Sequence, residues 1–209
     1  MSARPQAAEH LQDAGPRGLV VVLHGGQSVS TAPTTVVQLS VVRMIPVARA
    51  VRRAVAAGAI VVCRPRFRLR GWNGTQASPV GDLTGWLDEA ARRLGDVPIA
   101  LIGHSMGARA AFRAAGHPQV RAVAGLAPWL PPGEPVEQLA GRQVLLAHGD
   151  CDGVTSPAQT WAFADRARAV TQVTTVAVRG GDHAMLRGAP RWHRLAADFA
   201  RGAFGPPGG

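Results

Sequence analysis

The sequence contains no lysine and no tyrosine, so its 23 basic residues are all arginines, and they give a formal net charge of +10. A charge of this size would suit a nucleic-acid partner. The arginines are scattered, however, and they accompany abundant alanine, glycine, proline and valine, as a genome-wide compositional preference would produce. We therefore expect no nucleic-acid binding.

Cysteine is too scarce for a disulfide framework or a metal cluster. The two cysteines, Cys63 and Cys151, belong to no C-x-x-C motif, and both are expected to be reduced. Long apolar runs are also missing: none approaches the roughly eighteen residues that span a bilayer, and the first residues lack a signal-peptide pattern. We expect a cytoplasmic protein with no membrane partner.

What the sequence does contain is one notable turn motif. Residues 103–107 read Gly-His-Ser-Met-Gly, between an apolar run at 99–102 that predicts a buried strand and a helical pattern at 108–115. A strand that becomes a helix so abruptly strains its central residue, and the flanking glycines avoid clashes of a Cβ. Ser105 is thus predicted to lie exposed at the tip of a sharp turn, beside the positive end of a helix dipole.

Apolar, β-branched runs alternate with helical patterns along the whole chain. The runs predict strands at 19–23, 59–63, 99–102, 120–126, 143–147 and 174–178. Helical patterns occupy 47–57 with Pro46 at the start, 82–94 capped by Asp82, 108–115, 157–169 capped by Ser156, and 192–201.

This alternation predicts one α/β domain over residues 18–203, with a mostly parallel sheet of about six strands and helices on both faces. Residues 1–17 are expected to form a loose lead-in and 204–209 a disordered tail. In such sheets, ligands bind outside the carboxyl ends of the strands.

A serine hydroxyl is a poor nucleophile unless a base lies within hydrogen-bonding reach and a third group orients that base. His183 follows the last strand and is interpreted as the base rather than as an incidental surface histidine. Asp152 follows the fifth strand and is interpreted as the orienting acid, in preference to Asp150, which could instead bond the loop backbone.

The other rim residues have less specific interpretations. The N–H of Met106 and that of Gly26 or Gln27 could stabilise an oxyanion. Trp129 and Trp72 suggest a substrate pocket. Three further histidines beside glycines are interpreted as packing or loop-fixing groups rather than metal ligands: His24, His104 and His148.

Four arginines alternate with other residues between Arg64 and Arg70. They could favour an acidic substrate group. We favour a solvated edge with ion pairs to Asp82, Asp88 or Glu89.

The motifs H-G-G, G-H-S-M-G, H-G-D-x-D and G-D-H follow one another along the chain. Together they resemble the α/β-hydrolase superfamily over residues 19–199, in the order nucleophile, acid, histidine. The resemblance points to small members of the dienelactone-hydrolase-like or esterase-like branches. It implies the nucleophile Ser105, the acid Asp152, the base His183, and an oxyanion hole at Met106 with Gly26 or Gln27.

Full members of the superfamily have eight strands. This chain lacks residues for the first two, antiparallel strands and for an inserted lid or cap domain. The usual strand order of the fold would separate the strands bearing Cys63 and Cys151 by four steps, about 19 Å, which is beyond disulfide reach.

The expected function is therefore that of a serine hydrolase without metal or cofactor, which cleaves a small-molecule carboxylic ester or related acyl bond through an acyl-enzyme. The same residues could serve a thioesterase, a peptidase or an acyltransferase. A non-catalytic binding protein on the same fold is the alternative from a different class.

Overall fold

A computed structural model describes residues 15–204. Six strands form one parallel sheet in the order β2-β1-β3-β4-β5-β6, which confirms the predicted fold class. The strands are β1 (Gly18–Leu23), β2 (Ile60–Cys63), β3 (Ile99–His104), β4 (Val120–Leu126), β5 (Gln143–Gly149) and β6 (Val173–Val178). Every predicted strand is present.

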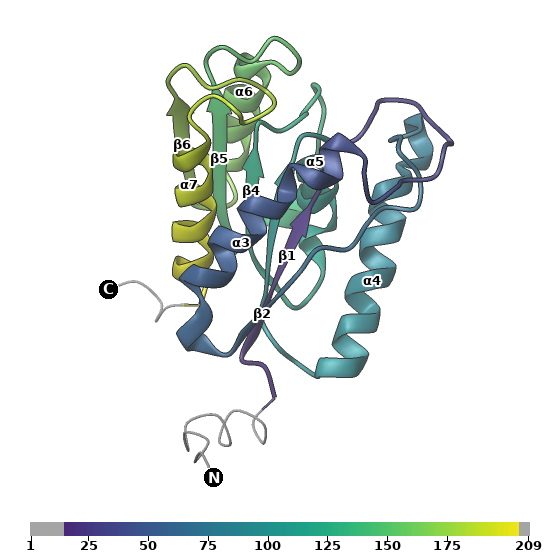
Figure 1. Ribbon diagram of the computed structural model, residues 1–209, viewed down its shortest axis with the longest axis vertical. Helices are drawn as coiled ribbons and strands as arrows, with labels where there is room; N and C mark the ends of the chain where they lie inside the picture. Colours follow the sequence, from purple (N-terminus) through teal and green to yellow (C-terminus); the bar gives the residue numbers. More distant parts are fainter. Residues whose placement is uncertain (1–14, 205–209) are drawn as a thin grey trace.

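Two helical layers cover the sheet (Figure 1). Helices α3 (Met44–Ala54) and α7 (Ala189–Gly202) cover one face, and α4 (Ser78–Leu94), α5 (Met106–Arg113) and α6 (Pro157–Ala167) cover the other. The short elements are α2 (Leu39–Val42), η2 (Ala56–Gly58), η3 (Gly74–Gln76), η4 (Ala114–Gly116) and η5 (Glu137–Leu139).

The strand order explains why the helices divide in this way. The chain moves outward from β1 to β2 and then returns past β1 to β3. Because crossovers between parallel strands are right-handed, this reversal of direction places α3 on one face and α4 on the other. The reversal also creates a switch point between β1 and β3, where ligands bind in folds of this kind.

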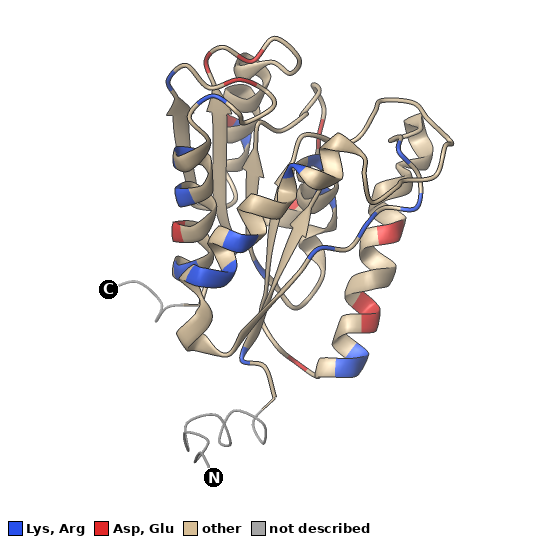
Figure 2. Cartoon of the chain, in the orientation of Figure 1, with Lys and Arg blue, Asp and Glu red and all other residues tan. Residues whose placement is uncertain are grey.

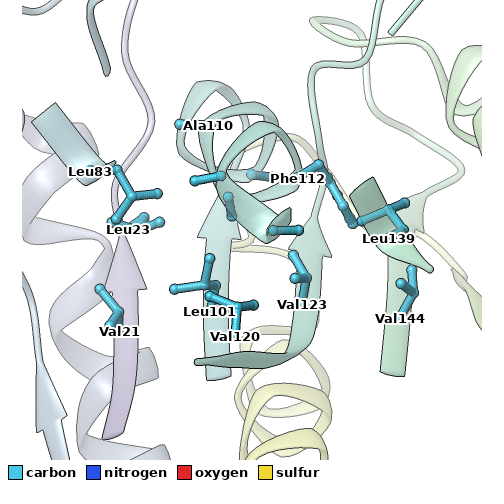
Figure 3. Packing of buried hydrophobic residues seen from close by; sticks show 14 of the residues in the cluster. Val21, Leu23, Leu83, Leu101, Ala110, Phe112, Val120, Val123, Leu139 and Val144 are labelled. Atoms are coloured by element: carbon cyan, nitrogen blue, oxygen red, sulfur yellow. The ribbon is translucent and has the colours of Figure 1, made fainter. Parts of the chain in front are cut away.

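Alternate residues of β1 build the two halves of the core. Val21 and Leu23 face the α4 and α5 layer, whereas Val20 and Val22 face α3 and α7. Figure 3 shows the first of these clusters, with Phe112 of α5 lying over the sheet. Both faces of the central strands are buried, as a continuous apolar run predicts.

Three predicted helix starts were wrong. The helix expected at 192–201 is α7, which begins at Ala189. Helix α4 begins at Ser78 with Pro79 in its first turn, and Asp82 does not cap it. The Asp82 carboxylate instead accepts hydrogen bonds from the backbone N–H of Arg68 (2.7 Å) and from its Nε (2.6 Å). The helix expected at 47–57 begins at Met44, because a proline is tolerated anywhere in the first turn, where no N–H needs an intrahelical acceptor.

The bounds of the domain, predicted at residues 18 and 203, stay a prediction. Regular structure starts at Gly18 and closes at Gly202. Most of the predicted lead-in and nearly all of the predicted tail lie outside the described residues. Among residues 15–204, no helix is long and apolar enough to cross a membrane.

The two cysteines occupy the places that the family's strand order implies. Cys63 ends β2 and Cys151 follows β5, which lies four steps away in the sheet. Both are free thiols.

The described arginines lie on all five long helices, α3 to α7, on β4 and on connecting loops (Figure 2). Several form ion pairs along their own helix, such as Glu89 with Arg92 and Arg93, and Asp198 with Arg201. Pairs of this kind are typical of solvated helix faces. The absence of a nucleic-acid partner stays a prediction.

Phe112→Ala is expected to lower the free energy of unfolding by about 3–5 kcal/mol. Phe112 is 1% exposed, and its ring lies 5.2 Å from that of Phe163, centroid to centroid. Urea denaturation measures the loss. The control Val61→Ala, on edge strand β2 and 41% exposed, should lose less than about 1 kcal/mol. Equal losses in the two variants would contradict this account of the core.

Candidate active site

Ser105 occupies a strained turn between β3 and α5, and only 7% of its surface is exposed, so the prediction of an exposed serine was wrong. Its φ is 54° and its ψ −119°, a conformation that L-residues rarely adopt. A Cβ at Gly103 would lie 2.4 Å from the backbone of Ala108, and one at Gly107 would lie 2.3 Å from the carbonyl oxygen of His24. Both glycines of the motif are therefore required by close backbone approach, as the sequence predicts.

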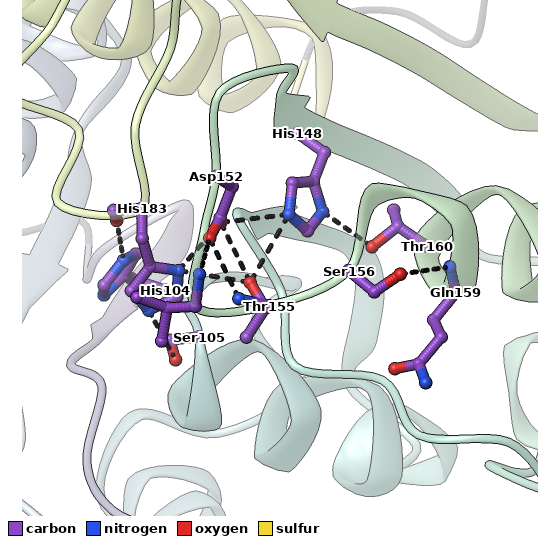
Figure 4. Close-up of polar contacts among 10 residues, drawn as sticks. His104, Ser105, His148, Asp152, Thr155, Ser156, Gln159, Thr160 and His183 are labelled. Atoms are coloured by element: carbon purple, nitrogen blue, oxygen red, sulfur yellow. Dashed lines mark hydrogen bonds and ion pairs between the residues drawn. The ribbon is translucent and has the colours of Figure 1, made fainter.

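The three residues expected to cooperate lie in hydrogen-bonding contact (Figure 4). His183 Nε2 is 3.1 Å from Ser105 Oγ, and His183 Nδ1 is 2.8 Å from Asp152 Oδ2. Because a carboxylate can only accept, Nδ1 carries the proton of the neutral ring and Nε2 accepts from the serine hydroxyl. This is the tautomer that a general base requires.

Five donor groups reach the Asp152 carboxylate. Oδ1 accepts from the backbone N–H groups of Val154 (2.8 Å) and Thr155 (2.9 Å), and Oδ2 accepts from the Thr155 hydroxyl (2.9 Å), His183 and His148. Burial alone would raise the pKa of Asp152, but the backbone N–H groups of Thr155 and Val154 and the contact with His183 lower it to about 2. The buried carboxylate thus remains charged well below neutral pH.

His148 takes a larger role than the loop-fixing one that the sequence suggested. It is fully buried, with Nε2 3.0 Å from Asp152 Oδ2 and Nδ1 2.7 Å from Thr160 Oγ1. Burial lowers the pKa of His148, so in its neutral form it donates to Asp152 and accepts from Thr160. A second imidazole therefore holds the acid from the side opposite His183.

Thr155 was missed by the sequence reasoning. The spacing Asp-x-x-Thr after a strand was the available signal, because aspartate side chains commonly bond backbone N–H groups two and three residues later. The Thr155 hydroxyl also lies 3.1 Å from His183 Nδ1.

His104 holds the backbone of the base, His183, through a hydrogen bond. Its Nε2–H donates to the backbone carbonyl of His183 (2.8 Å), and its Nδ1 is buried without a hydrogen-bond partner among the described residues. Burial, and then the neighbouring His183, lower the pKa of His104 to about 3. Protonating Nδ1 would bury a charge with no acceptor.

His24 and Asp150 have structural roles, as the sequence suggested. His24 Nδ1–H donates to the carbonyl of Gly25 (2.7 Å), and His24 Nε2 accepts from the N–H of Phe67 (3.2 Å). Asp150 Oδ1 accepts from the N–H of Gly180 (2.6 Å). These bonds fix the loops on either side of the site.

The structure distinguishes between Gly26 and Gln27, the alternative residues predicted to donate a backbone N–H to the oxyanion together with Met106. The N–H of Gln27 donates to the carbonyl of Arg70 (2.8 Å), so the expectation for Gln27 does not hold here. The N–H groups of Gly26 and Met106 have no assigned acceptor among residues 15–204. A Cβ at Gly26 would lie 2.4 Å from the Arg70 carbonyl oxygen, so only glycine fits this position.

Of the two tryptophans predicted to contact substrate, Trp129 contacts the nucleophile's backbone and Trp72 packs against Trp129. The N–H of Trp129 donates to the carbonyl of Ser105 (3.3 Å), and the ring of Trp129 meets that of Trp72 edge to face, 6.0 Å between centroids. Both line a groove of about 620 Å³.

The arginine cluster at 64–70 contains one of the ion pairs that the solvated-edge interpretation predicts. Arg68 binds Asp82, and Arg70 donates through Nε to the carbonyl of Pro33 (2.9 Å). Asp88 and Glu89 have other partners, His117 and the arginines of α4. Within the described residues, no three His, Cys, Asp or Glu side chains form a group that could hold a metal ion.

Acid is expected to destabilise the fold through His104. Its pKa falls from the ordinary 6.5 to about 3, so below pH 6.5 the unfolded chain binds a proton that the folded chain does not. The stability is fully present above pH 6.5 and is lost as pH falls toward 3, by about 3 kcal/mol between pH 7 and pH 4.5. Urea unfolding at both pH values measures this loss. His104→Gln should lose correspondingly less, and an unchanged pH dependence would refute the assignment.

No protein-family model and no curated protein matches the chain. Among solved structures it is similar to an α/β serine hydrolase homologue from Coxiella burnetii (TM-score 0.62, 20% identity, 88% of each chain covered). It is also similar to a lid-less α/β serine hydrolase from Xanthomonas campestris (TM-score 0.64, 19% identity, 94% of this chain and 87% of that one).

A third similar structure is the esterase domain of a Rhodothermus marinus protein (TM-score 0.64, 18% identity, 92% of this chain and 90% of that one). Together with the sheet order and the turn at Ser105, these likenesses confirm the resemblance stated from the motifs: the chain has the fold of the α/β-hydrolase superfamily.

Proposed function

We propose that this protein is a serine hydrolase that cleaves a carboxylic ester through an acyl-enzyme. The observation that carries the proposal is the unbroken line of hydrogen bonds from Ser105 Oγ through His183 to Asp152. A serine without a catalytic role would not be expected to contact a histidine 78 residues away. The other ring nitrogen of this histidine is bound by a buried carboxylate.

In the first half of the reaction, His183 Nε2 takes the proton of Ser105 as Oγ attacks the carbonyl carbon of the ester. The carbonyl oxygen becomes negative, and the N–H groups of Met106 and Gly26 stabilise it. His183 then gives its proton to the leaving alkoxide, and the C–O bond of the ester breaks. Asp152 remains ionised throughout and stabilises the imidazolium form of His183.

In the second half, His183 removes a proton from water, which attacks the acyl carbon. The tetrahedral intermediate collapses, the proton returns to Ser105 Oγ, and the carboxylic acid leaves. The strained φ at Ser105 contributes by keeping Oγ directed at the imidazole. The nucleophile is therefore already oriented before the substrate binds.

Ser105→Ala is expected to remove catalysis and covalent labelling together. The wild-type protein should react with a fluorophosphonate probe and release a burst of nitrophenol from a short-chain 4-nitrophenyl ester, and the variant should lose at least about a thousandfold in kcat. Ser156→Ala, at the cap of α6, serves as the control and should retain labelling. A folded wild-type protein that never labels, yet binds an ester without turnover, would favour a non-catalytic binding protein.

His148→Leu is expected to lower kcat about tenfold, because it removes one hydrogen bond to the charged Asp152. His148→Gln keeps an N–H donor near the same position and should recover most of the rate. Steady-state kinetics together with thermal denaturation separate positioning from simple loss of folding. If the Gln and Leu variants lost equal activity at equal stability, the role of His148 in holding the acid would be excluded.

A further inference from the structure

A groove lies close to the turn that carries the nucleophile. The N–H of Trp129 donates to the carbonyl oxygen of Ser105 (3.3 Å), and Arg109 lies one helical turn beyond Ser105 on α5. Both residues line the groove, whose volume is about 620 Å³. Trp129 therefore links the turn of the nucleophile to the groove.

Two indole rings and a guanidinium form one side of the groove. The Arg109 guanidinium lies 3.9 Å from the ring centroid of Trp72 and 4.5 Å from that of Trp129. Trp72 is buried, so its ring serves as a fixed support for Arg109. Trp129 is partly exposed, and its ring offers a face on which a planar partner can stack.

The two arginines beside the groove carry more positive charge than the one buried carboxylate that they bind can neutralise. Glu134 is buried, and its carboxylate accepts from Nε of Arg109 (2.5 Å) and from Nε of Arg113 (2.5 Å). One guanidinium would neutralise this carboxylate, so the second is in excess. Arg113 has a side chain 36% exposed, and no acidic side chain between residues 15 and 204 lines the groove.

We propose that this groove is a subsite for a planar, negatively charged substituent of the ester substrate, and that Arg113 is the residue that selects the charge. The proposal rests on the proposed esterase function and names its substrate class. A carboxylate at the end of an aromatic or conjugated group would stack near Trp129 and reach Arg113. A neutral substituent of the same shape gains the stacking but not the charge interaction.

The test compares esters that differ only in charge. One pair places the charge on the alcohol side, 4-acetoxybenzoate against 4-methylphenyl acetate. The other places it on the acyl side, methyl hydrogen terephthalate against methyl 4-methylbenzoate. Acid release in a pH-stat gives kcat/KM for each ester, and the anionic-to-neutral ratio is compared between variants, so intrinsic reactivity cancels.

In Arg113→Gln, the ratio for at least one pair is expected to fall about fivefold, mainly through KM of the anionic ester. Arg113→Lys should keep part of the preference because it keeps the charge. The matched control is Arg121→Gln, which removes an exposed arginine near the amino end of β4, away from the site. About 0.5 M sodium chloride should reduce the wild-type ratio.

A second readout does not depend on turnover. Benzoate should quench tryptophan fluorescence of the Ser105→Ala protein more strongly than benzyl alcohol does, and Arg113→Gln or Trp129→Phe should weaken this quenching. Thermal denaturation of each variant checks that the Glu134 contacts have not collapsed.

The outcomes distinguish the two proposals. Ester hydrolysis with a ratio unchanged in Arg113→Gln, or lowered equally in Arg121→Gln, overturns the subsite and leaves the esterase. Arg113-dependent benzoate binding without hydrolysis of any ester overturns the esterase and leaves an anion-binding groove. Failure of benzoate to bind, with no charge preference among the esters, removes the subsite by both measurements.

Discussion

The site depends on how closely the backbone of α5 approaches β1 and β3. At residues 103 and 107 the backbone comes so near its neighbours that not even a methyl group would fit. This contact forces the chain from strand to helix at a single residue and holds Ser105 at a positive φ. The strain of that residue is sustained by the burial of the apolar face of α5 against the sheet.

The second organising element is the buried carboxylate of Asp152. It accepts hydrogen bonds from more donors than it has favoured lone-pair positions. A buried charge is tolerated only when it is fully hydrogen-bonded, and here backbone, hydroxyl and imidazole groups share the task. The arrangement fixes the acid in one orientation, and through it the tautomer of His183. Orientation of the base is therefore determined by residues on β5 and α6 that do not contact the nucleophile.

Much of this site could be predicted because each principal residue directly follows a strand. Runs such as residues 19–23 and 120–126 are apolar enough to identify central strands, and the carboxyl ends of parallel strands share one edge. That rule, the glycine-flanked serine motif and the chemistry that a serine nucleophile requires together placed Ser105, Asp152 and His183.

Other features depend on contacts that periodicity does not encode. Gln27 lost its predicted role because its N–H pairs with the segment near Gly71 in an isolated bridge. Asp82 follows a proline that starts its helix earlier, which left its carboxylate free to bind Arg68. The contact of His148 with Asp152 needed the curvature of the loop after β5, and the pairing of two arginines with Glu134 needed the path of the loop after β4.

The bond from His104 to the carbonyl of His183 has a mechanical consequence. His104 is the residue next to the nucleophile, so the loop carrying the base is tethered directly to the turn carrying the serine. This tether restrains the backbone of the base relative to the nucleophile, and so restrains the distance over which the proton passes.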